Sequence, residues 1–522
     1  MSLAVNVMGV AHPVPASAAS LAPRCGRQAG RTGAVGGHSM VRAPCAPALR
    51  RLRMPLSAHQ PALPGAVLRR AVSHPAASRE SLSHPPSPVA RLPPQASRLA
   101  LPPASHGSLR RRSRLQQAAR AVAAPPLSAP ASGAFDADGS TQRLLSGLNG
   151  KALRNLPVSS YPSMPDVLRA IPKHCFEKDT SKSLFYAALS TAMTLACALL
   201  AATYLPLTLA WTPAWIAYAL VTGTVATGCW VVAHECGHGA FSDNKLLQDA
   251  VGYALHSALL VPYFSWQRSH AVHHARTNHI EEGETHVPMR GDKPDGQFMF
   301  SLKERLGERL FGLVNLVAVL GFGWPVYLLT GASGGPVRGQ TNHFWPYSGA
   351  EGRHALFPGK WASKVLLSDI GIVAVLAALG AWAFSAGSLW PVLALYVAPL
   401  LVTNAWLVAY TWLQHTDVDV PHFGGDDWSP VKGSLATIDR PYGPLFDFLH
   451  HRIGSSHVAH HVNHTIPHYH AKEATEALKA AFPEHYLYDP TPVHVALWRV
   501  VTKCTAVVQR PTGEWVFQAT RS

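Results

Sequence analysis

The sequence predicts an all-α, polytopic membrane protein with four transmembrane helices in two hairpins, and three observations support this fold class. Charged residues make up only 14% of the 522-residue chain, well below the roughly 25% of soluble domains. Four stretches without charge are long enough to cross a bilayer, which takes about 20 residues in a helix. Clusters of histidine lie at or near the ends of such stretches. A spanning stretch must be helical, because lipid cannot satisfy free backbone groups.

The N-terminal segment 1–134 carries the net charge of the chain. It contains 17 arginines, no lysine and one acidic residue, Glu80, which gives the same formal charge of +16 as the whole chain. An Arg- and Ser-rich, acid-poor composition is typical of an organelle transit peptide, and its scattered prolines favour disorder. We therefore expect a disordered, transit-like extension over 1–134 and a membrane domain over 135–522. A disordered extension without a targeting signal is the alternative.

The basic residues do not indicate a nucleic-acid partner. A DNA- or RNA-binding domain needs a basic face on a folded unit, with base-reading or aromatic groups among the charges. The excess of arginine is confined to 1–134, where prolines recur too often for a folded face.

The predicted spans form two hairpins with short links. The four spans are Leu184–Leu205, Pro213–Ala233, Ile370–Ala386 and Leu389–Leu413. The links at 206–212 and 387–388 contain neither lysine nor arginine. Because basic residues favour the cytoplasmic side, both links are expected on the opposite side of the membrane.

Histidines are concentrated in two windows, with eight in residues 234–286 and ten in residues 415–470. The first box, His234-Glu235-Cys236-Gly237-His238, directly follows the second span. Two boxes of the form HxxHH supply His270, His273 and His274, and then His457, His460 and His461. On a helix, residues at i, i+3 and i+4 share one face, so each box directs its imidazoles to one side. Ser269 and Ser456, directly before the HxxHH boxes, are the expected N-caps.

Eight imidazoles from three short helices can surround two metal ions. His415, just beyond the last span, is a candidate ninth ligand. Neutral imidazole binds Fe, Zn, Cu and Ni, so the ligand type alone does not identify the metal. Other histidines near the boxes are expected to support the site or the fold; they are His279, His286, His464, His468 and His470.

Parity of the crossings determines the placement of two further apolar stretches, 246–264 and 310–329. Box one follows two crossings, and the second hairpin adds two more before box three. All boxes must lie on one side of the membrane to share a site, so neither stretch is expected to cross. Leu310–Leu329 is long enough to cross, but we expect it in or along the interface, with capping helices that carry the boxes above it.

A zinc metalloprotease is an alternative from another class. His234, Glu235 and His238 satisfy the H-E-x-x-H motif, in which the glutamate is the general base. That reading leaves both HxxHH boxes without a role, and Gly237 weakens a continuous motif helix. A haem carrier is also disfavoured, since haem needs one or two axial histidines rather than eight or nine.

The order HxxxH, HxxHH, HxxHH around apolar hairpins resembles the membrane fatty-acid desaturase family. The likeness extends from about Ile171 to Phe517 and includes strings outside the boxes, such as Leu413-Gln414-His415-Thr416 and Ile466-Pro467-His468-Tyr469-His470. These strings resemble the delta-12 (omega-6) and omega-3 acyl desaturases. The resemblance implies two non-haem iron ions that activate O2, an acyl-lipid substrate in the membrane, and an external electron donor.

The resemblance implies no catalytic residues beyond the metal ligands. The soluble di-iron bundles use Glu and Glu-x-x-His ligands, whereas here the ligands would be histidines. Carboxylates are expected behind them as orienting groups; the candidates are Glu235, Asp417 and Asp439.

The resemblance points to more than one branch of the family, and the branch and the N-terminal segment imply different electron donors and membranes. Glu235, the His-Val-Ala-His-His box and the Leu413–Thr416 string resemble the delta-12 branch, which converts oleoyl to linoleoyl chains. Gly239 and the string 171–175 are closer to the omega-3 (delta-15) branch, and fatty-acid hydroxylases share the same boxes. The delta-12 branch implies an endoplasmic reticulum membrane and cytochrome b5. The transit-like segment implies a chloroplast membrane and ferredoxin, so both remain open.

Overall fold

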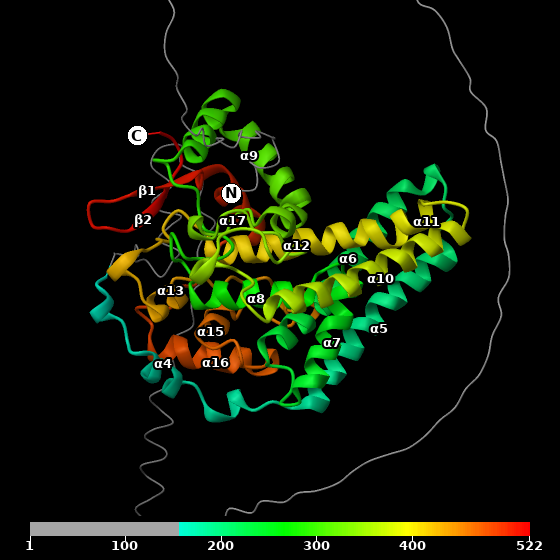
Figure 1. Cartoon of the computed structure of the whole chain (residues 1–522), viewed down its shortest axis with the longest axis horizontal. Coiled ribbons are helices and arrows are strands. Elements are labelled where there is room, and N and C mark those ends of the chain that lie inside the picture. Colours follow the sequence, from blue (N-terminus) through cyan, green and yellow to red (C-terminus); the bar gives the residue numbers. More distant parts are fainter. Residues whose placement is uncertain (1–155, 522) are drawn as a thin grey trace, which may run out of the picture. The chain divides into compact units, whose positions relative to one another are not determined.

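The structure is a computed structural model, and it describes residues 156–521 (Figure 1). The extension expected over 1–134 lies outside the described residues. Within them the chain is largely helical, which confirms the all-α class. The longer helices are α5 (Thr180–Tyr204), α6 (Thr212–His238), α7 (Lys245–Ala258), α8 (Tyr263–Ala275), α9 (Pro294–Thr330), α10 (Trp361–Ser385), α12 (Ala398–His415), α16 (His468–Ala481) and α17 (Val493–Lys503). The short ones are α4 (Met164–Ala170), α11 (Trp390–Val392), α13 (Pro430–Leu435), α14 (Pro444–Leu449) and α15 (His457–Val462).

Four helical segments coincide with the predicted spans, and the described chain is a helical membrane protein. The segments are 180–204, 209–238, 361–385 and 390–415, all apolar enough to cross a membrane. The last one joins α11 and α12 through a π-helical turn at Leu393–Val397. Side chains such as Leu199, 69% exposed, face outward from α5. Such exposure is expected where lipid covers the surface.

Helix α6 is the central helix of the spanning part. It packs against α5, α7 and α12, and Figure 1 shows α5 and α6 running together over most of their length. At Gly223 a side-chain Cβ would lie only 2.4 Å from the Pro399 carbonyl oxygen of α12. Glycine is therefore required where these two helices cross, in the way that small residues allow close approach between membrane helices.

A fifth helix, α9, also has the length and apolarity of a span. It contains the stretch 310–329 that we expected along the interface. At Gly307 its backbone has φ 72°, ψ 161°, so two helices meet there at a kink. Helix α9 packs against α12, α17 and strand β1, beside the C-terminal part of the chain (Figure 1).

The chain on both sides of α9 returns to the same place. After the helix, the Ser333 carbonyl accepts a hydrogen bond of 3.0 Å from the Val287 N–H, and Gly335 N–H donates to Gly283 at 3.0 Å. Val287 lies seven residues before the start of α9, a stretch that spans at most about 25 Å. The hydrocarbon core is about 30 Å thick. These bonds join the segments before and after α9, which supports the prediction that both of its ends lie on one side.

The remaining elements form a cap beyond the end of α12. It contains α13 to α17 and a two-stranded antiparallel sheet, β1 (Ala506–Gln509) and β2 (Trp515–Gln518). These strands were not expected from the sequence. Val507 exchanges backbone hydrogen bonds of 2.8 Å with Met289 and Gly291, so the hairpin holds the loop that follows box two.

This arrangement predicts the sides on which loops are exposed. In a background without native cysteines, Asp292→Cys and Glu351→Cys, on either side of α9, should react with an impermeant maleimide from the same face. Ser388→Cys, in the link between α10 and α11, should react from the other face. Labelling of positions 292 and 351 from opposite faces would show that α9 crosses the membrane.

Candidate metal centre

Box one forms the last turn of α6. His234 and His238 lie one turn apart on this helix, and His234 is 2% exposed. The helix ends at Gly239, whose left-handed backbone (φ 77°) accepts the chain reversal that follows. Glycine is the usual residue at such a C-terminal position, because it adopts positive φ without a steric cost. Gly237 does not break the motif helix.

Box two lies on the last two turns of α8. His270 and His274 point to one group of histidines, while His273 points to a second group. The expectation that Ser269 caps this helix is wrong, because α8 already begins at Tyr263. The Ser269 hydroxyl instead donates to the Trp266 carbonyl at 3.1 Å and lies 3.0 Å from the His343 ring.

Box three forms the short helix α15. Ser456 occupies its N-cap position, as expected, but its hydroxyl donates to the Arg452 carbonyl instead of capping the helix. The cap is supplied from a distance by Asp439, whose carboxylate accepts the Val458 N–H at 2.9 Å. A helix of six residues cannot persist alone, so this contact fixes where the three imidazoles point.

The nine predicted histidines converge in two groups. The first consists of His234, His238, His270, His274 and His460, whose possible ligand atoms all lie within 4.8 Å of one another. The second consists of His273, His415 and His461 within the same limit, together with His457, whose Nε2 is 2.9 Å from that of His415. Four separate helices contribute, and none of the nine lies apart.

The spacing of the ring nitrogens fits metal coordination. In the first group the Nε2–Nε2 distances are 3.0 Å for His234–His270 and 3.1 Å for His234–His238. In the second group the His273–His415 distance is 3.1 Å. With metal–nitrogen bonds of about 2.1 Å, two ligands at right angles lie about 3.0 Å apart, while tetrahedral ligands lie about 3.4 Å apart. The observed distances are short enough for neighbouring nitrogens to share one metal ion.

Unpartnered nitrogens support the same interpretation. Nε2 of His460 and Nε2 of His461 are buried and have no hydrogen-bond partner, and a buried polar atom without a partner is costly. On the outer side, His273 Nδ1 lies 2.7 Å from the Glu284 carbonyl oxygen, and His461 Nδ1 lies 2.9 Å from the Thr277 hydroxyl. When these Nδ1–H groups donate outward, the Nε2 lone pairs face the two groups, as metal ligands require.

Burial keeps these imidazoles neutral. It lowers the pKa of His273 to about 4 and the pKa of His270 well below its usual value, where the neighbouring histidines add to the effect. Burial also lowers the pKa of His460 and His461 far below the usual range. At neutral pH these rings therefore offer lone pairs to a cation without first losing a proton.

Glu235 does not act on the ligands as a hydrogen-bond acceptor. Its Oε1 is 3.8 Å from His234 Nδ1, whereas its Oε2 accepts the His468 backbone N–H at 2.9 Å, at the start of α16. This placement does not support the zinc-protease alternative. In that class the glutamate activates water at the metal, whereas here the carboxylate holds a neighbouring helix and seven further histidines surround the pair.

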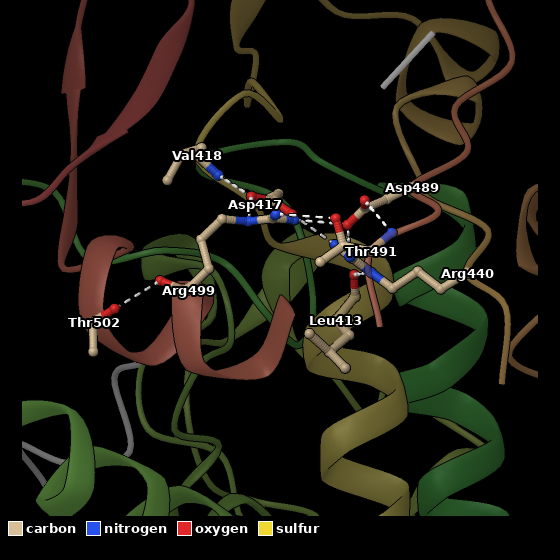
Figure 2. Close-up of polar contacts among 8 residues, drawn as sticks. All are labelled: Leu413, Asp417, Val418, Arg440, Asp489, Thr491, Arg499 and Thr502. Atoms are coloured by element: carbon tan, nitrogen blue, oxygen red, sulfur yellow. Dashed lines mark hydrogen bonds and ion pairs between the residues drawn. The ribbon is translucent and has the colours of Figure 1, made fainter. Parts of the chain in front are cut away.

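Asp417 belongs to a buried ion network rather than to a histidine (Figure 2). It pairs with Arg440 at 2.7 Å and with Arg499 at 2.5 Å, and both arginines also pair with Asp489. The Arg440 Nε donates to the Leu413 carbonyl in the last turn of α12 at 3.0 Å. The network thereby fixes the helix end that carries His415. None of the three predicted orienting carboxylates accepts a hydrogen bond from the ring of a predicted ligand: Asp439 caps α15, Asp417 acts on the end of α12 through Arg440, and Glu235 holds the start of α16.

Two histidines that the sequence analysis set aside lie beside the groups. The His464 ring is 4.7 Å from that of His238, and the His286 ring stacks on His415 at 5.8 Å. His286 and Thr285 both have positive φ, a strained backbone that is found mainly at functional sites. The sequence offered no signal for this strain, because neither residue is glycine or asparagine.

A cavity of about 50 Å³ adjoins the histidines, and His270 and His273 form part of its lining. Its other walls are mostly apolar and come from α6, α8, α9 and α12; they include Trp230, Trp266, Trp324, Leu407, Val408 and Thr411. The site thus joins a nitrogen-rich centre to an apolar space.

Comparisons with known proteins agree with this arrangement. The model of the fatty acid desaturase family matches residues 209–491. The chain is 39% identical over 364 residues to a delta-12 fatty-acid desaturase of Vernicia fordii. The aligned region covers 69% of this chain and 91% of the relative. It is 39% identical over 363 residues to an omega-6 fatty acid desaturase, endoplasmic reticulum isozyme 1, of Glycine max, with coverages of 68% and 89%. To an oleoyl-12-hydroxylase of Ricinus communis the identity is 38% over 359 residues, with coverages of 68% and 89%.

The two groups predict a stoichiometry of about two metal ions per chain, as in other paired-metal sites. His460→Ala, which removes a nitrogen from the first group, should lower the metal content of purified protein by about one ion, and His461→Ala should do the same for the second group. The exposed His494→Ala is the matched control and should keep both ions. Metal analysis that finds one zinc ion per chain in the unaltered protein would contradict the paired site.

The cap of α15 predicts a difference between two substitutions of Asp439. Burial raises the pKa of Asp439 to about 6, so an ionised carboxylate is costly there. Asp439→Asn keeps an acceptor for Val458 N–H without a charge and should be tolerated. Asp439→Ala leaves that N–H and the Tyr486 hydroxyl without their acceptor, which costs about 1–3 kcal/mol. Thermal unfolding in detergent measures the difference, and the exposed Asp426→Ala is the control; equal midpoints for the Asn and Ala variants would rule out capping.

Proposed function

This chain belongs to the fatty acid desaturase family, and on that premise we propose that it is a delta-12 acyl-lipid desaturase that converts oleoyl to linoleoyl chains in a membrane. The observation that carries the proposal is the convergence of nine imidazoles, on four helices, at the end of an apolar cavity. Family membership makes it an enzyme, an oxidoreductase that acts on fatty acyl chains.

The nine histidines are proposed as ligands of two non-haem iron ions. The site is rich in neutral nitrogen donors, which suit iron among other metals. When bound, two iron ions supply the activation of O2 that removal of hydrogen from an unactivated carbon chain requires. In the balanced reaction, one CH2–CH2 pair loses two hydrogens and O2 becomes two molecules of water. The other two electrons and two protons come from an external donor and from solvent.

The residues of the chain position the substrate and exclude water. We place the reacting part of the acyl chain in the cavity of about 50 Å³ that His270 and His273 line, and name it the acyl cavity. The indole rings of Trp230, Trp266 and Trp324 form apolar walls there. His273 cannot rotate away, because its Nδ1 is held by the Glu284 carbonyl and by the Thr285 hydroxyl. A rigid, dry cavity brings a chosen carbon close to the metal ligands, which is the protein's main contribution in cofactor chemistry.

Hydroxylation at carbon 12 is the second candidate, because the identity to the Ricinus communis hydroxylase is within one percentage point of the identity to the desaturases. Both reactions need the same cavity and the same electrons. They differ in whether the activated carbon loses a second hydrogen or gains a hydroxyl group. Desaturation at the omega-3 position is the third outcome that an assay should separate.

The electron donor and the compartment are proposed together. We propose a chloroplast membrane and ferredoxin, on the composition of residues 1–134. The endoplasmic reticulum, with cytochrome b5, is the alternative that the name of the Glycine max relative favours. A fluorescent fusion of residues 1–134 that enters plastids would support the first compartment, and reticular labelling by the full chain would support the second.

The proposal predicts a new fatty acid in a yeast that lacks polyunsaturated lipids. Cells that express the chain should form linoleate from oleate. His270→Ala should abolish it, because this residue both lines the cavity and faces the first histidine group, whereas His494→Ala should leave it unchanged. Gas chromatography of fatty acid methyl esters measures the product.

A product other than linoleate would identify a different reaction. Ricinoleate from oleate would identify a hydroxylase. Alpha-linolenate formed only when linoleate is fed would identify an omega-3 enzyme. Absence of any modified acyl chain, with the protein present in the membrane, would contradict the proposal.

A further inference from the structure

A second, polar cavity lies on the same side of the membrane as the histidines. Its volume is about 670 Å³, and no step of the proposed reaction uses it. Its walls come from the first turns of α5, from the segment around α14 and from one face of α16. The first turns of α5 and the last turn of α6 lie at the same end of their hairpin, so this cavity opens toward the aqueous face that carries box one.

Three exposed lysines form the rim of this cavity: Lys182, Lys472 and Lys479. Among the described residues, none of them makes an ion pair; Lys182 lies over the Tyr469 ring at 4.3 Å and Lys479 over the Tyr488 ring at 5.6 Å. Of the two acidic residues that line the cavity, Asp447 pairs with Arg452 at 3.2 Å. The second acidic residue is Glu476, so the three rim lysines outnumber the one remaining carboxylate and the rim has a net positive charge.

The floor of the polar cavity leads to the metal centre. His451 and His468 also line a space of about 10 Å³ whose other walls include Glu235 and His460. That volume holds about one water molecule. From the rim inward, the Tyr469 ring is parallel to the Tyr186 ring with centroids 6.3 Å apart, and the Tyr186 ring lies 4.6 Å from the His468 ring. The His468 N–H then donates to Glu235, the neighbour of His234.

The polar cavity and the acyl cavity approach the histidines from different sides. The small space behind the polar cavity reaches His460 and contains Val231 and Glu235 of α6, whereas the acyl cavity contains Trp230 of α6 and reaches His270 and His273. The two share no lining residue. A partner at the polar cavity can therefore act while an acyl chain occupies its own cavity.

We propose that the lysine rim of the polar cavity is the docking surface for the acidic face of a small electron-carrier protein. This inference rests on the proposed function, because that reaction needs two electrons from outside the chain. The carrier is oxidised by one electron at each encounter, and the two electrons complete the reduction of O2 to water. Positive and negative patches steer such encounters, which are brief and bury little surface.

A binding experiment on the full protein tests the docking surface. The protein, in nanodiscs of phosphatidylcholine, is titrated separately with the soluble haem domain of cytochrome b5 and with a [2Fe–2S] ferredoxin. Lys182→Glu with Lys472→Glu should weaken binding of the accepted carrier at least about tenfold at low ionic strength. The difference should shrink at high salt, because the Debye length falls from about 10 Å at 0.1 M to about 3 Å at 1 M.

The control carries the same charge change elsewhere. Lys293→Glu with Lys360→Glu alters two exposed lysines outside the rim and should bind as the unaltered protein does. Both double variants should keep their metal content and their unfolding midpoint. Lys182 lies in the first turn of α5, where a glutamate is favourable to the helix, so loss of folding does not confound the result.

The outcomes are distinguishable. Equal binding by the rim variant and the control overturns the proposal. Failure of both carriers to bind, together with rim-dependent binding of phosphatidylglycerol added to the nanodiscs, also overturns it and identifies the cavity as a lipid headgroup site. Turnover of the unaltered protein with dithionite and O2 tests the function separately. No acyl product under those conditions, despite rim-dependent carrier binding, contradicts the reaction and leaves the docking surface standing.

Discussion

The structure depends on one constraint: imidazole nitrogens from distant parts of the chain must converge in two groups, in which neighbouring Nε2 atoms lie as close as 3.0 Å. Such an arrangement is unfavourable unless a cation occupies it, since unpartnered buried nitrogens and facing lone pairs both cost free energy. The fold supplies the convergence through the ends of α6 and α12 and through the faces of α8 and α15. Separate contacts fix the positions of α12 and α15.

The means of fixation differ from helix to helix. Helix α12 is held by the network of Asp417, Arg440, Asp489 and Arg499, in which two acidic and two basic groups are buried together. Burying charges is tolerable only when they are paired and their remaining donors are used; here Arg440 also donates to the Leu413 carbonyl. Helix α15 depends instead on a cap from Asp439, and α16 on Glu235. Asp417 and Asp439 thus orient helices that carry imidazoles of the two groups, whereas Glu235 holds the neighbouring helix α16.

The four spans and the clustered histidines could be predicted from the sequence because both depend on local patterns. Uncharged stretches of about 20 residues and the spacings HxxxH and HxxHH are visible without any tertiary information, and the placement of α9 on one side stays a prediction. The cap of α15, the ion network and the strained Thr285–His286 turn could not be predicted, since each depends on residues that are distant in the chain. Ser269 shows the same limit: the serine before box two looked like a helix start, but apolar packing of Tyr263 and Trp266 begins α8 earlier.

Helix α9 has a consequence for the membrane itself. A long apolar helix with both ends on one side would add volume to that leaflet, whereas the opposite leaflet contains only the far halves of the four spans and their links. Helices that lie in one leaflet respond to lipid packing and curvature. An enzyme that makes acyl chains more unsaturated changes that packing, so α9 would couple the protein to the physical state of the lipid that its own reaction produces.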